Sequence, residues 1–162
     1  MAQGFIKNKD QTVMTWGTWY RFKLYQTESG DDGHDARSRS LPSAASLSHL
    51  DIVFEDVASG TDMQYNIRVT YDKAGNDPVV TGLNNLKPKN GRNFDSDDEN
   101  VKLQCIDFGA RYFFTAPSTQ HKTGQIYLFV YPFVVSGSDS DATANSVKLR
   151  TARLHWRDDD GS

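Results

Sequence analysis

The segment from Met63 to Tyr71 shows the cleanest alternation of apolar and polar residues in the chain. Its apolar positions are Met63, Tyr65, Ile67, Val69 and Tyr71, and the positions between them carry Gln, Asn, Arg and Thr. Successive side chains of a β-strand point to opposite faces of its sheet. A period of two therefore predicts a strand with one buried face and one solvent-facing face.

The segment from Ile126 to Val135 differs, because it carries neither a charged nor an amide side chain. At a period of two, one face holds Ile126, Leu128, Val130, Pro132 and Val134, and the other holds Tyr127, Phe129, Tyr131 and Phe133, which we call the aromatic ladder. A half-buried strand is apolar on one face only, so both faces of this strand need a cover. The cover of the aromatic ladder is a second sheet, a partner subunit, or a flat ligand such as a sugar or a base.

Weaker versions of the same pattern predict the remaining strands. They cover residues 13–25, 50–57, 79–83, 101–108, 110–115 and 147–156, and the two segments on either side of Gly109 could also be one bent strand. Gly17 predicts a bulge or bend, and the alternation slips near Thr151 as a β-bulge requires. Residues 27–48 are read as a long polar loop, in which Pro42 opens a short turn through Leu47.

Seven or eight strands with unequal polar loops and almost no helix predict an all-β fold. The aromatic content of 12% and the frequent Gly, Asn, Asp and Ser breaks agree with this. We expect one antiparallel β-sandwich domain, jelly-roll-like, over residues 13–157, with an N-terminal arm at 1–12 and an acidic tail at 158–162. A small barrel is the alternative. The order of the strands cannot be read from the pattern.

Charge and cysteine content narrow the class of protein. The net charge of −3 argues against a surface that coats nucleic acid, although a local basic patch is compatible with it. The single Cys105 excludes an internal disulfide, and because it alternates with Val101 and Leu103 we interpret it as a core residue. The first residues lack the apolar run of a secretory signal, and no run is long enough to span a bilayer. We expect synthesis in a cytoplasm.

Catalytic chemistry has little support in the sequence, and we expect neither an enzyme nor a cofactor. His49 lies two residues before Asp51 and could pair with it as a base and its orienting carboxylate, but such spacings are common by chance. Acidic loops around Asp95 and Asp97, and around Asp139 and Asp141, offer oxygen ligands for Ca²⁺. Neither completes a calcium-binding loop, so solvated loops are the favoured interpretation and we predict no metal site.

Assembly is the function that the sequence favours. The aromatic ladder would form the contact, because aromatic side chains dominate protein interfaces, and the arm would wrap a neighbouring subunit. Small β-sandwich subunits without a signal peptide and with one free cysteine are common among virion components, including head-decoration, collar and tail proteins of phages. We therefore expect a homo-oligomer or a subunit of a larger assembly, with the virion as its mature location.

Two binding functions are the alternatives. A carbohydrate- or receptor-binding module would use Trp16, Trp19 and Tyr25 as flat platforms. A protein that binds single-stranded nucleic acid would combine aromatic platforms with the Lys and Arg side chains of the last strand, and the acidic tail would compete for its groove. The aromatic ladder has no interleaved cation on its own strand, so we do not expect nucleic acid to be the partner.

Overall fold

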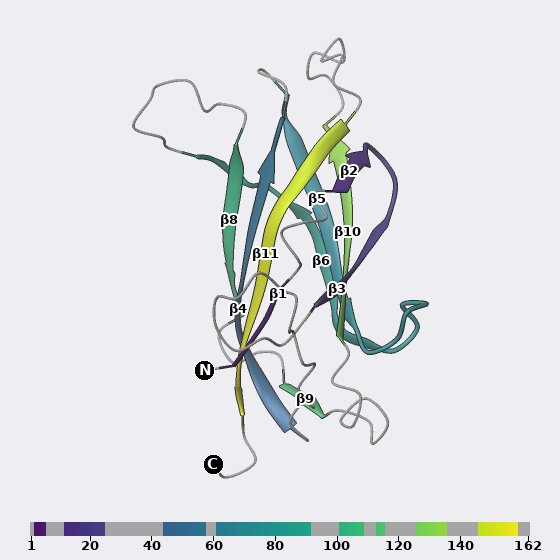
Figure 1. Ribbon diagram of the computed structural model, residues 1–162, viewed down its shortest axis with the longest axis vertical. Coiled ribbons are helices and arrows are strands. Elements are labelled where there is room, and N and C mark those ends of the chain that lie inside the picture. The colour runs from purple at the N-terminus through teal and green to yellow at the C-terminus, as the bar shows by residue number, and fades with distance from the viewer. Residues whose placement is uncertain are drawn as a thin grey trace.

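The computed structural model describes residues 2–5, 12–24, 44–57, 61–91, 101–108, 113–115, 126–135 and 146–158. These residues form strands and connecting turns, with no helix among them, arranged as two antiparallel sheets that face each other (Figure 1). The predicted β-sandwich is confirmed. The barrel alternative is wrong, because the two sheets do not close on each other.

The larger sheet has the order β1-β11-β4-β8-β7, with β2 also paired to β11 and β9 also paired to β4. Its strands are β1 (Ala2–Phe5), β2 (Thr12–Thr15), β4 (Ala44–Glu55), β7 (Lys89–Asn90), β8 (Lys102–Asp107), β9 (Phe113–Thr115) and β11 (Ser146–Asp158). The long strands β4 and β11 lie side by side at its centre (Figure 1). This pairing brings a segment from the first third of the chain against the C-terminal segment.

The smaller sheet has the order β3-β10-β5-β6. Its strands are β3 (Tyr20–Leu24), β5 (Met63–Thr70), β6 (Pro78–Leu86) and β10 (Ile126–Val134). The two strands with the clearest sequence patterns, β5 and β10, are direct neighbours and pair from Tyr127 opposite Thr70 to Val134 opposite Met63. The aliphatic positions of β10 therefore lie beside the buried positions of β5.

The core fills the space between the two sheets. Phe54 of the larger sheet and Tyr65 of the smaller sheet meet edge to face, with ring centroids 4.9 Å apart. The Tyr65 hydroxyl donates a hydrogen bond of 2.7 Å to Oε1 of Gln104 on β8, which links the sheets by a polar contact as well. The largest fully buried side chain is that of Trp156. Packing of both inner faces explains the alternation seen along the strands.

The predicted strand over 13–25 is two strands in different sheets. Gly17, with a φ of 77°, lies between β2 and β3 and turns the chain from the larger sheet to the smaller one. A positive φ is nearly free of strain for glycine, which explains why this residue marks the corner. The corner is fixed to β10, because the Gly17 N–H donates to the Pro132 carbonyl at 2.7 Å. The bend was predicted, but the change of sheet was not.

Part of the predicted loop over 27–48 belongs to a strand. β4 begins at Ala44. Buried and partly exposed residues alternate from its first position, with Ala45 and Leu47 buried. Pro42 lies outside the described residues, and the turn predicted through Leu47 is wrong over its last residues. Alanine and serine favour strands weakly, so their alternation gave little signal.

Both ends of the domain also differ from prediction. Ala2–Phe5 of the expected arm form β1, which pairs with Arg153–Trp156 of the same chain rather than extending freely. Asp158 of the expected tail still belongs to β11. The bulge predicted near Thr151 is confirmed, since the pairing of β11 with β4 shifts between Leu149 and Thr151.

Candidate functional site

The aromatic ladder lies on the outer face of the smaller sheet. Its aliphatic neighbours Ile126, Leu128 and Val130 are fully buried in the core, so the alternate positions point away from the other sheet. Tyr127 is 5% exposed, whereas Phe129, Tyr131 and Phe133 are each partly exposed. Thus the second sheet covers the aliphatic face only.

Part of the ladder is covered by the chain itself. The turn between β5 and β6 approaches Phe129 so closely that a Cβ on Gly75 would lie 3.3 Å from its ring. Tyr131 packs against Trp19 of the β2–β3 corner, with ring centroids 5.2 Å apart and the rings tilted by 46°. The ladder is therefore partly covered by other segments of the chain and partly open to solvent.

Cations lie on both strands that flank the ladder. Phe129 is paired with Arg21 of β3 on one side and with Arg68 of β5 on the other, and Tyr127 is paired with Lys23. Residues paired directly across antiparallel strands point to the same face. The outer face of the smaller sheet thus alternates aromatic and cationic side chains across its strands, which the pattern along β10 alone could not reveal.

An open pocket of about 390 Å³ lies at one end of this face, lined by Arg21, Lys23, Lys73 and Tyr127. Nη1 of Arg21 donates a hydrogen bond of 3.2 Å to the Lys73 carbonyl, which fixes the guanidinium at the pocket. None of the described residues that line it is acidic. We refer to Arg21, Lys23, Arg68 and Lys73, together with the aromatic ladder and Trp19, as the cationic face.

Of the predicted ligand platforms, the fold gives Trp16 and Trp19 different surroundings. Trp19 is 42% exposed and joins the cationic face, where the Arg68 guanidinium carbon lies 5.2 Å from the centre of its ring. Trp16 is partly buried and packs against the core. Tyr25 lies outside the described residues, as do the calcium candidates Asp95, Asp97, Asp139 and Asp141. Trp19 and the aromatic ladder, considered separately in the sequence, are thus one surface.

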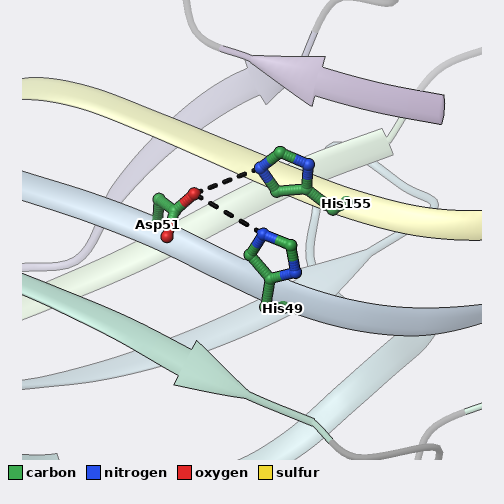
Figure 2. Close-up of side chains that lie close together, drawn as sticks. All are labelled: His49, Asp51 and His155. Carbon is green, nitrogen blue, oxygen red and sulfur yellow. Dashed lines mark hydrogen bonds and ion pairs between the residues drawn. The ribbon is translucent and has the colours of Figure 1, made fainter. Parts of the chain in front are cut away.

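A second cluster lies on the outer side of the larger sheet. Oδ2 of Asp51 is 3.2 Å from Nε2 of His155 and 3.7 Å from Nε2 of His49 (Figure 2). The two imidazole rings stack with centroids 3.9 Å apart and planes 16° apart. His49 and Asp51 come from β4, and His155 comes from β11. The sequence indicated His49 with Asp51 but missed His155, because only the pairing of β11 with β4 brings it close.

The surroundings of the cluster set its protonation. Burial and the neighbouring His49 lower the pKa of His155, and the hydrogen bond to Asp51 opposes them only partly.

Cys105 of β8 is paired with Asp51 and is exposed, so its interpretation as a core residue is wrong. On β8 it is Ile106 that is buried instead, and Phe108, directly after the strand, is buried as well. Partial desolvation, a hydrogen bond to Asp51 and nearby carboxylates raise the pKa of the Cys105 thiol.

No protein-family model matches the chain, and no curated protein matches it. In the described part of the chain there is also no helix long and apolar enough to cross a membrane.

Proposed function

We propose that this protein is a non-enzymatic assembly module that binds through its cationic face. The observation that supports this is a row of partly exposed aromatic rings flanked by arginine on both neighbouring strands. Aromatic residues and arginine are the residue types most enriched in protein interfaces and in their energetic hot spots. Trp19, at 42% exposed, is a large apolar side chain that a partner could cover.

We propose that the partner of this face is an acidic protein surface, supplied by a second copy of this chain. The whole chain has a net charge of −3 although four cations gather on the cationic face, so the remainder of the chain is more acidic than the total indicates. Contact between the cationic face of one copy and the acidic remainder of another is electrostatically complementary. Such a head-to-tail contact extends into rings or filaments, as expected of a subunit of a larger particle such as a virion.

Single-stranded nucleic acid is the second candidate, and the cationic pocket is the observation that favours it. Arg21, Lys23 and Lys73 lie beside the aromatic ladder, and such binders combine a basic groove with stacking platforms. The ladder is less suited to stacking, because Phe129 is already in contact with the Gly75 turn and Tyr131 with Trp19. A base would have to displace these contacts to reach a ring face.

Sedimentation velocity over a range of protein concentrations and salt tests the assembly proposal. We expect concentration-dependent association that weakens as salt rises, because screening reduces the attraction between opposite charges. The double variant Arg21→Glu/Lys23→Glu should sediment as a monomer. Its matched control, Lys89→Glu/Arg157→Glu, changes the net charge equally on exposed residues of the larger sheet and should associate like the parent.

A second pair of variants separates the aromatic contribution from the charge. Trp19→Ala should weaken association at least tenfold, whereas Leu103→Ala, equally exposed at 42% but on β8 of the other sheet, should not. A parent protein that stays monomeric at every concentration and salt overturns the proposal. If the same monomer binds a labelled oligothymidylate with a steep salt dependence, the nucleic-acid alternative takes its place.

A further inference from the structure

We propose that His49, Asp51 and His155 form a binding site for a divalent transition-metal ion, with Zn²⁺ as the ion to test. The site lies on the larger sheet and is independent of the cationic face. Two imidazole nitrogens and one carboxylate oxygen are the donor types that zinc binds in proteins. Each of the three residues offers one donor atom, and these three atoms all lie within 4.8 Å of one another.

The separations between the donor atoms match those of a zinc site. With Zn–N and Zn–O bonds of about 2.0–2.2 Å, a tetrahedral ion holds its ligand atoms about 3.3–3.6 Å apart. Oδ2 of Asp51 is 3.2 Å from Nε2 of His155 and 3.7 Å from Nε2 of His49, values on either side of that range. Binding therefore needs shifts of only a few tenths of an ångström between these atoms.

The orientation of the rings requires a larger adjustment. The imidazoles stack with planes only 16° apart, so their in-plane lone pairs do not converge on one point. An ion between the two Nε2 atoms would make the rings splay. The His155 side chain is 9% exposed and the His49 side chain is 28% exposed, so His49 has the space to rotate. We therefore expect His155 and Asp51 to stay in place and His49 to move on binding.

A hydrogen bond to the far nitrogen of His49 supports the role of Nε2 as a ligand. Oγ of Ser48 lies 2.9 Å from Nδ1 of His49. When Nδ1–H donates to this hydroxyl, the proton is on Nδ1 and Nε2 carries the lone pair that a metal needs. Such outer hydrogen bonds are a regular part of metal sites, because they fix the tautomer and orientation of the ligating histidine.

The ion would be reached from solvent through Asp51, whose side chain is 46% exposed. Charges on the neighbouring strands balance, since Arg153 is paired with Asp51 and Asp107 is paired with His49. The three protein ligands leave one tetrahedral position open on the solvent side, where water completes the coordination. Cys105, paired with Asp51 on β8, is a soft donor on the neighbouring strand and is the residue to exclude by experiment.

Zinc titration by calorimetry, with a chromophoric chelator as competitor, tests the site on the intact chain. We expect one ion per chain and a rise in the thermal unfolding midpoint when zinc is present, because a ligand that binds only the folded state stabilises it. Asp51→Asn and His49→Gln should each weaken zinc binding at least tenfold. His155→Gln should do the same, but its buried position makes the two more exposed variants the decisive ones.

Two matched controls keep the test specific. Asp107→Asn removes a carboxylate opposite His49 without touching the proposed ligands, and Cys105→Ser removes the neighbouring thiol. Both should bind zinc within about twofold of the parent protein. Nitrogen NMR of the histidine side chains should show Nε2 of His49 and of His155 shifting together at one equivalent of zinc. Zinc affinity unchanged in Asp51→Asn and His49→Gln, or lost in Cys105→Ser alone, would overturn the proposal.

Discussion

Replacing Tyr65 with phenylalanine should have opposite effects on stability at neutral and at high pH. At neutral pH the variant loses the hydrogen bond of 2.7 Å from the Tyr65 hydroxyl to Gln104. A hydrogen bond of this kind contributes about 1 kcal/mol to the free energy of unfolding. We therefore expect Tyr65→Phe to be about 1 kcal/mol less stable than the parent protein at pH 7.

At high pH the sign of this difference changes. Tyr65 is fully buried, and burial raises its pKa far above the ordinary tyrosine value of 10.0. Above pH 10 the unfolded chain releases the proton that the folded chain retains, so the parent loses about 1.4 kcal/mol of stability per pH unit from this residue. Phenylalanine has no proton to lose. The stability of the variant should therefore equal that of the parent at about pH 11 and exceed it beyond.

Urea unfolding followed by tryptophan fluorescence between pH 7 and 11.5 or so measures both effects. Trp156, which is fully buried, reports the loss of the core. Gln104→Met is the control, because it breaks the same hydrogen bond but keeps the ionisable hydroxyl. Its stability curve should lie below that of the parent and run parallel to it. A Tyr65→Phe curve that also stays parallel through the whole range would refute the reasoning.

Two further predictions concern the turn between β5 and β6. Gly75→Ala should lower the free energy of unfolding by about 1–2 kcal/mol, because it places a side chain at a φ of 79° and against the Phe129 ring, and chemical denaturation measures this. Asp72 accepts backbone hydrogen bonds from residues 76 and 77, which lower its pKa, so its contribution to stability is present at neutral pH and lost as the pH falls through the carboxyl range. The stability of Asp72→Asn should therefore fall less at acid pH than that of the parent protein in the same assay. An equal loss of stability at acid pH in both proteins would contradict this prediction.

On most strands the sequence predicted which face each residue occupies, with β8 and its exposed Cys105 as an exception, but it did not predict which strands are neighbours. Alternation alone placed Tyr65 inward and the aromatic ladder on the opposite side of β10 from the aliphatic residues. The cations beside the ladder were not predicted, because Arg21 and Phe129 meet only when β3 pairs with β10. Likewise Asp51 and His155 are 104 residues apart in the chain. Cross-strand neighbours depend on sheet order, and no local pattern encodes that order.

Errors in the predicted strands have local causes of a different kind. The strand expected over 13–25 divides at Gly17. This was not predicted, because the sequence shows the same alternation whether the chain continues in one sheet or crosses to the other. β4 was predicted to begin at Leu50 rather than Ala44 because small residues bury little area and so give a weak pattern. In both cases the packing of a whole sheet, which a short window does not contain, decided the outcome.

The two proposed sites lie on opposite outer faces of the sandwich, and this makes their tests independent. Sheets packed face to face are about 10 Å apart, and the side chains between them are core residues that neither site uses. Substitutions that share no partners at such a distance act additively. Arg21→Glu/Lys23→Glu should therefore abolish association without changing zinc affinity, and Asp51→Asn should weaken zinc binding without changing the sedimentation of the zinc-free protein. A variant of one face that altered both readouts would show that the sandwich transmits a structural change between its sheets.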